Sequence, residues 1–176
     1  MKKILTGVAV LMMLANSGCG YSTRSLLPGN YKNIFVLPVE NKIDYMSQDQ
    51  RKLYIPGIET RVRSGLIDRF MFDGNLRISD QMDADLELEA KLLSFDREEL
   101  QLTTNADVKE YRLRIVVALK IIDKADSDKI LWEEPSFAGE ATYFISGPQA
   151  RSEEAAINDC LKDLAQRVVA RTIENW

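Results

Sequence analysis

Histidine is absent from all 176 residues of the chain. Its absence excludes Ser-His-Asp and Cys-His catalysis, histidine-based metal sites and the commonest general base. The nine glycines form neither a GxGxxG nor a GxxxxGKS phosphate loop. Acidic pairs such as Glu98-Glu99 and Glu133-Glu134 are adjacent, so their side chains diverge on a strand or a helix. We therefore expect a binding or assembly protein that is not an enzyme and needs no cofactor or metal.

Basic residues are also in short supply. Lys and Arg number 23 against 27 Asp and Glu. Removal of residues 1–18, which we expect to be a signal peptide, takes away Lys2 and Lys3 and lowers the net charge to −6. Nucleic-acid binding requires a basic surface. We therefore expect no nucleic-acid partner.

Long apolar runs are missing except at the N-terminus. Lys2 and Lys3 precede an eleven-residue run from Ile4 to Leu14, which is too short to span a bilayer but is typical of a secretory signal. The Gly18-Cys19 pair that follows resembles the lipobox of bacterial lipoproteins, in which cleavage leaves a lipidated cysteine. Asn16 stands where that motif usually carries Leu. The alternative is an ordinary signal peptide followed by a chance cysteine.

These features predict three segments: a signal peptide over residues 1–18, a lipidated tether over 19–32 and one domain over 33–176. Lipidation at Cys19 would anchor the protein, because several acyl chains together bind a membrane stably. Gly20 follows the cysteine in place of the Asp that retains enterobacterial lipoproteins in the inner membrane. The resemblance therefore implies an outer-membrane location on the periplasmic side. Cys160 has no intrachain partner left and is expected to be a small buried residue.

The most regular stretch of the domain runs from Ala84 to Ile122 and predicts two long paired strands. Apolar residues alternate with polar ones in both halves, which is typical of strands with one buried face. The buried set is Ala84, Leu86, Leu88, Ala90 and Leu92 on the first strand, and Tyr111, Leu113, Ile115, Val117, Leu119 and Ile121 on the second. The alternation changes phase at Phe95, which predicts a β-bulge near Ser94. The other faces are acidic (Asp85, Glu87, Glu89) and basic (Arg112, Arg114, Lys120), which predicts cross-strand ion pairs.

Two amphipathic helices are available to cover the buried face. One is expected to open at Pro56, with Ile58, Val62, Leu66 and Phe70 recurring every fourth residue, and to stop near Gly74. The other carries an apolar stripe from Ile157 to Val168. The predicted fold class is α+β: a two-layer sandwich with a mostly antiparallel sheet of about four strands and two helices on one face.

Several short motifs, in this order, resemble the lipopolysaccharide-assembly lipoprotein family LptE. They are Gly18-Cys19-Gly20-Tyr21, Asp83-Ala84-Asp85-Leu86, Glu110-Tyr111-Arg112-Leu113 and Leu131-Trp132-Glu133. The resemblance implies a sheet packed by two helices, binding to the outer-membrane barrel LptD as a plug, and assistance in lipopolysaccharide insertion. A polar barrel interior suits a plug with charged outer faces. The competing interpretation is a generic envelope lipoprotein that scaffolds a secretion or cell-wall complex without contacting lipopolysaccharide.

Lipopolysaccharide contact requires cations, because its phosphates are anionic. Arg151 is the first candidate, since it lies near the expected start of the last helix, where a bound phosphate is stabilised. Arg97 and Lys109 are the other candidates, because the turn between the long strands would present them beside one another.

The lipidation hypothesis predicts that Cys19→Ser abolishes acylation, because the thiol is the acceptor of the first lipid. Mass spectrometry of the wild-type N-terminus should show cleavage before Cys19 and an added acyl mass. The variant should be uncleaved or released from the membrane fraction. A mature N-terminus elsewhere, without acyl mass, would contradict the hypothesis.

Overall fold

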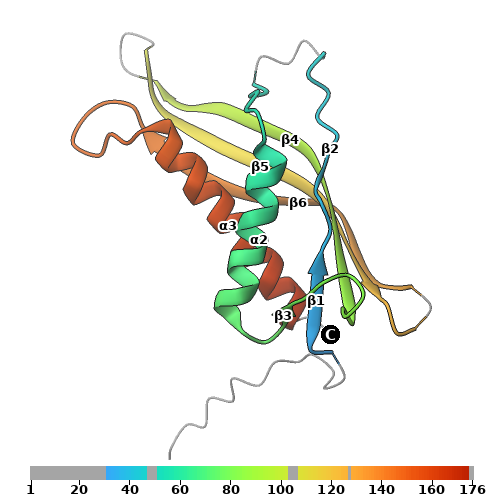
Figure 1. Ribbon diagram of the computed structural model, residues 1–176. Helices are drawn as coiled ribbons and strands as arrows, with labels where there is room; N and C mark the ends of the chain where they lie inside the picture. The colour runs from blue at the N-terminus through green and yellow to red at the C-terminus, as the bar shows by residue number, and fades with distance from the viewer. Residues whose placement is uncertain (1–30, 47–50, 103–106, 127, 175–176) are drawn as a thin grey trace, which may run out of the picture.

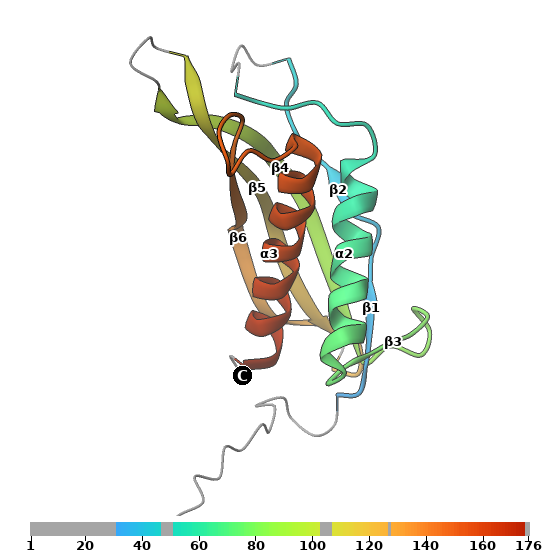
Figure 2. The ribbon, with the colours of Figure 1, turned by 90° about the vertical axis from the view of Figure 1, so that its left-hand side faces the viewer.

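The computed structural model describes residues 31–46, 51–102, 107–126 and 128–174. Its elements in chain order are β1 (Asn33–Val36), β2 (Glu40–Asn41), α2 (Ile58–Asp73), β3 (Arg77–Ile78), β4 (Leu86–Leu102), β5 (Val108–Asp123), β6 (Lys129–Phe144) and α3 (Glu153–Glu174). Both helices lie on one face of the sheet and run in the same direction (Figures 1 and 2). The predicted two-layer α+β architecture is therefore confirmed.

The sheet is larger and more mixed than predicted. It has six strands in the order β3-β1-β4-β5-β6, and β2 also pairs with β4. The β4–β5 and β5–β6 pairs are antiparallel, as expected, but β1–β3, β1–β4 and β2–β4 are all parallel. The prediction of about four mostly antiparallel strands was therefore wrong in number and in part in direction. The reason is the α2 connection, which carries the chain back along the sheet, so that β3 and β4 run parallel to β1 before β5 turns antiparallel to β4.

The β4–β5 pair is the long hairpin that the alternation predicted. Its register extends from Leu86 opposite Asp123 to Leu102 opposite Val108. A register shift between Leu92 and Ser94 confirms the predicted bulge and turns Phe95 into the core. Every residue of the predicted inward set is buried except the half-buried Tyr111. The hairpin extends beyond the N-terminal ends of both helices (Figures 1 and 2).

The predicted ion pairs between the two strands form only in part. Glu89 lies opposite Lys120, with Oε2 3.7 Å from Nζ. Arg112 and Arg114 lie further along the hairpin, because antiparallel pairing sets the start of β4 against the end of β5. Asp85 instead accepts the backbone N–H groups of Lys32 and Asn33, each at 2.8 Å.

The first helix buries the predicted stripe of Ile58, Val62, Leu66 and Phe70. It opens at Ile58, two residues after the expected Pro56, because Gly57 adopts a left-handed conformation with φ 72°. Gly74, with φ 77°, ends the helix and donates its N–H to the Phe70 carbonyl at 3.0 Å. Only glycine adopts such angles without strain.

The second helix, α3, approaches β6 closely at Gly139. A Cβ atom on Gly139 would lie 2.5 Å from Leu164 Cβ and 2.7 Å from the Leu164 backbone nitrogen. Beside it, Cys160 Sγ lies 3.3 Å from the Gly139 carbonyl oxygen. The absence of a side chain at Gly139 therefore sets the distance between α3 and the sheet.

Gly139→Ala should destabilise the fold by roughly 1–3 kcal/mol, because α3 must move away and the core loses packing. Gly65→Ala in α2 is the matched control: its Cβ would meet nothing within 4 Å. That variant should gain about 0.5–1 kcal/mol from helix propensity. Urea denaturation followed by circular dichroism measures both free energies of unfolding. Equal stability of the two variants would contradict the close approach.

Candidate functional site

The three predicted cations lie toward the end of the sheet where α3 begins, but two of them are already paired. Arg151 precedes α3, whose first residue is Glu153, and donates to the Asp159 carboxylate. The start of α3 is also occupied: Ser152 Oγ accepts the Ala155 N–H at 3.2 Å, and the first turn is acidic. These groups already satisfy the positive end of the helix dipole.

Arg97 is held between β4, β5 and α3. Its guanidinium donates to Glu153 at 2.8 Å and lies 4.9 Å from the centre of the Tyr111 ring. Burial opposes its charged form, but the hydrogen bond and charge of Glu153 outweigh burial, so the pKa of Arg97 is raised. Burial, together with the charge of Glu153, raises the pKa of the neighbouring Tyr143. Arg97 therefore joins the hairpin to the start of α3.

Lys109 is exposed, and its ammonium group lies 5.9 Å from the Phe144 ring centre. Among the described residues no carboxylate lies within ion-pair distance of it. Arg97 pairs with Leu113, and Leu113 lies four residues after Lys109 on β5. At about 3.4 Å per residue, the backbones of Arg97 and Lys109 are therefore roughly 14 Å apart along the strands. The turn does not bring Arg97 and Lys109 beside one another as expected.

The sheet face turned away from both helices, called here the open face, presents ordered rows of charge. Two rows cross β4, β5 and β6 as acid, base, acid: Glu89–Lys120–Glu133 and Asp96–Arg114–Glu140. A third runs Glu98–Arg112–Thr142, and between the charges lies the small row Ser94–Val116–Ala138. Arg114 Nε is 3.3 Å from Glu140, and a hydrogen bond from Lys91 lowers the pKa of Glu89. The open face is thus polar, with its charges matched in place.

The free edge of β6 is closed to another strand along much of its length. Asp163 of α3 accepts the outward Glu140 N–H at 3.0 Å, and Arg167 donates to the Ala138 carbonyl at 2.7 Å. The Arg151 backbone N–H donates to the Phe144 carbonyl at 2.9 Å. Pro135 has no N–H with which to bind another strand. Such coverage prevents strand addition. A partner strand therefore cannot pair with this part of the β6 edge.

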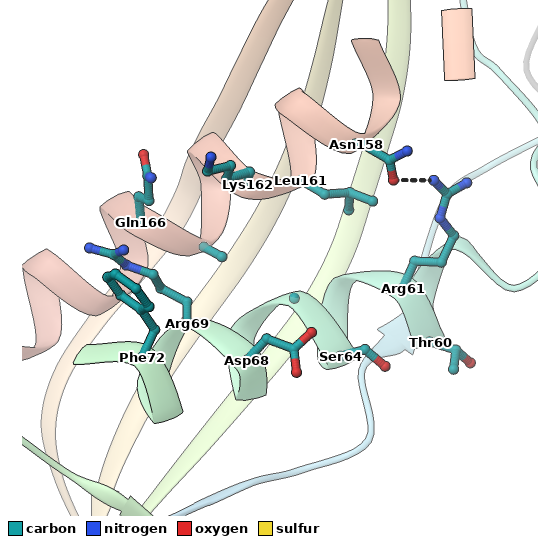
Figure 3. Close-up of a pocket in the computed structure, with 12 residues that line it drawn as sticks. Thr60, Arg61, Ser64, Asp68, Arg69, Phe72, Asn158, Leu161, Lys162 and Gln166 are labelled. Atoms are coloured by element: carbon teal, nitrogen blue, oxygen red, sulfur yellow. Dashed lines mark hydrogen bonds between the residues drawn. The ribbon is translucent and has the colours of Figure 1, made fainter. Parts of the chain in front are cut away.

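The helix layer contains a groove of about 850 Å³ between α2 and α3 (Figure 3). Its lining includes the small residues Gly65 and Ala165 and the cations Arg61, Arg69 and Lys162. Arg61 donates to Glu154 at 2.8 Å and to Asn158 at 3.0 Å, which joins the two helices at one end. Arg61, Asp68 and Arg69 lie off the apolar stripe that predicted α2, but the sequence contained no signal that α3 would lie alongside them.

The described residues offer little for catalysis. Burial raises the pKa of the Cys160 thiol to about 12, so it stays protonated and unreactive. No group of three His, Cys, Asp or Glu side chains there has the arrangement of a metal site. No helix in the same part combines the length and apolar character needed to cross a bilayer. Cys19 lies outside the described residues.

Comparison with known families decides the family question. The LptE family model, described as lipopolysaccharide-assembly, matches residues 31–172. The chain belongs to the LptE family. The match covers the sheet, α2 and nearly all of α3, so the family resemblance is confirmed. The Gly18-Cys19-Gly20-Tyr21 motif precedes the matched residues. No curated protein matches the chain.

Solved structures share the LptE-like fold at low sequence identity. A protein from Xanthomonas campestris aligns with TM-score 0.56 and 10% identity, covering 83% of this chain and 88% of its own. The uncharacterized lipoprotein B from Nitrosomonas europaea gives 0.55 and 14%, covering 84% of each chain. A hypothetical protein from Chlamydia trachomatis gives 0.54 and 12%, covering 81% and 95%. At these identities the likeness concerns the fold alone.

Proposed function

We propose that this LptE-family chain is a non-enzymatic lipoprotein of the outer membrane that binds the barrel LptD as a plug and assists lipopolysaccharide assembly. Family membership over residues 31–172 is the observation that carries the proposal. A lipid on Cys19 would hold the domain at the periplasmic side of the membrane. The domain then acts by binding and positioning.

The open face supports the plug role. Large outer-membrane barrels have a polar interior, so a plug must meet it with charge and hydrogen-bonding groups. The rows through Lys120 and Arg114 supply these, and their charges are compensated before any partner binds. Exposed ion pairs of this kind contribute only about 0–1 kcal/mol each to folding. The ion pairs instead give the open face a polar surface that can contact a partner without an opposite charge on the partner for each side chain.

A photo-crosslinking residue at Val116, in the centre of the open face, should trap LptD in intact cells. Met82, on the loop before β4 and 98% exposed, is a control of high accessibility away from that centre. We expect a clearly higher barrel yield from Val116, read by immunoblot. Crosslinks from Val116 only to peptidoglycan-associated or secretin proteins would favour the generic scaffold. Thr104 and Asn105, between the two long strands in sequence, are further positions for a crosslinker, but they lie outside the described residues.

We also propose that lipopolysaccharide phosphates contact the cations at the end of the sheet, with Lys109 first. Arg151 and Arg97 remain candidates, but a phosphate must compete there with Asp159 and Glu153. Lys109 faces no such competition among the described carboxylates. A cation–phosphate contact is therefore made at lower cost at Lys109.

Lys109→Glu should weaken lipopolysaccharide binding by about tenfold, which corresponds to about 1.4 kcal/mol. Arg151→Glu should have a smaller effect, because Asp159 already neutralises Arg151. Lys129→Glu, at the start of β6, is the control for net charge. Binding of fluorescent lipopolysaccharide to each purified protein gives the affinities, and circular dichroism confirms the fold. Equal losses in all three variants would mean that only net charge matters.

A further inference from the structure

The groove between α2 and α3 has properties that the plug role does not use. It lies on the helix layer, opposite the open face (Figures 2 and 3). Its lining begins at Thr60 and ends at Phe72 on α2, a length of about 18 Å at 1.5 Å per residue. Thr60, Asp68, Phe72 and Lys162 are exposed, so the groove opens to solvent.

Small residues line part of the groove, so that the helix backbone lies close to its surface. Gly65 sits in the middle of α2, where glycine costs about 1 kcal/mol relative to alanine. Its φ is not positive and a Cβ there would meet nothing within 4 Å, so neither conformation nor packing within the described chain calls for glycine. Ala165 lines the same groove from α3. Small residues of this kind let another backbone approach closely.

The sides of the groove carry positive charge that the described part of the chain does not neutralise. None of the ion pairs there includes Arg69 or Lys162, and Arg69 Nε is buried without a hydrogen-bond partner. The Arg69 guanidinium lies 5.1 Å from the centre of the Phe72 ring, which is 81% exposed. Asp68 is the single carboxylate in the lining. A protein of net charge −4 thus keeps a basic groove.

We propose that the groove is the docking site for an acidic amphipathic helix of a protein partner. Small apolar side chains of that helix would face Gly65 and Ala165, and its carboxylates would pair with Arg69 and Lys162. This is helix-in-groove recognition, with the partner forming a third helix of the layer. Charge complementarity selects the partner, and the glycine permits the close approach.

The distribution of side chains favours a helix over a lipid chain. The two cations of the lining that form no ion pair with a described residue lie on different helices, Arg69 on α2 and Lys162 on α3, whereas an anionic amphiphile needs its cations gathered at one end of an apolar channel. Polar residues follow the same length: Thr60 and Ser64 on α2, and Asn158 and Gln166 on α3. They match the polar flanks of a helix and would leave an acyl chain in contact with hydrogen-bonding groups.

The test uses the purified full-length protein and an 18-residue helical peptide with Ala and Leu on one face and Glu on both flanks. A counterpart with Lys for every Glu is the charge control. Fluorescence anisotropy of the labelled peptides should give at least about tenfold tighter binding for the acidic one. Gly65→Leu, which fills the groove, should weaken that binding by about tenfold or more.

Charge variants distinguish binding in the groove from attraction by the net charge of the protein. Arg69→Glu with Lys162→Glu should reverse the peptide preference, whereas Arg77→Glu with Lys129→Glu, the same charge change outside the groove, should leave the acidic peptide preferred. The proposal is overturned by equal binding of both peptides, by no binding at 1 mM peptide, or by an unaltered affinity in Gly65→Leu. It is also overturned if dodecyl phosphate binds in the groove and the acidic peptide does not, since the site then takes an amphiphile. Thermal melting of each variant confirms that it is folded.

Discussion

The antiparallel pairing of β4 with β5 is the contact on which the rest of the structure depends. It runs from Leu86–Asp123 to Leu102–Val108 and presents one continuous apolar face. β6 extends that face from one side, β1 and β2 from the other, and both helices cover it. A one-residue slip would move every one of these side chains to the open face. The bulge after Leu92 keeps the long strand in phase with its partners and places Phe95 in the core.

Compensation of charge within the domain is the second constraint. Arg97 joins the hairpin to α3 through Glu153, Arg61 joins the two helices through Glu154, and Arg167 closes the edge of β6. Each of these cations is committed to the architecture. Lys109, Arg69 and Lys162 form no ion pair in the described part of the chain. These cations are therefore the better candidates for binding a partner. They lie at one end of the sheet and in the helix groove.

The two layers thus offer different surfaces to different partners. The open face is broad, polar and internally balanced, which suits a polar enclosure such as a barrel lumen. The helix layer has a basic groove in which a Cβ added at Gly65 would meet nothing within 4 Å. Contacts from α3 cover part of the β6 edge, which disfavours strand addition there. Under the two proposals, one small domain contacts two partners from opposite sides.

The sequence by itself determined the elements whose periodicity is local: the buried face of β4 and β5, the bulge near Ser94, and the stripe of α2. The opposite face was predicted only in part, because Glu87 is 6% exposed and lies 3.5 Å from Lys124 Nζ. Alternation and fourth-residue spacing report burial directly, because each follows from the geometry of a single strand or helix. Strand count, parallel pairing and the partners of Arg97, Arg112 and Arg151 were decided only by the tertiary structure. The same holds for the groove and for the close approach at Gly139. Each of these depends on which segments, distant in sequence, contact one another. The spacing of apolar residues within one segment carries no information on such contacts.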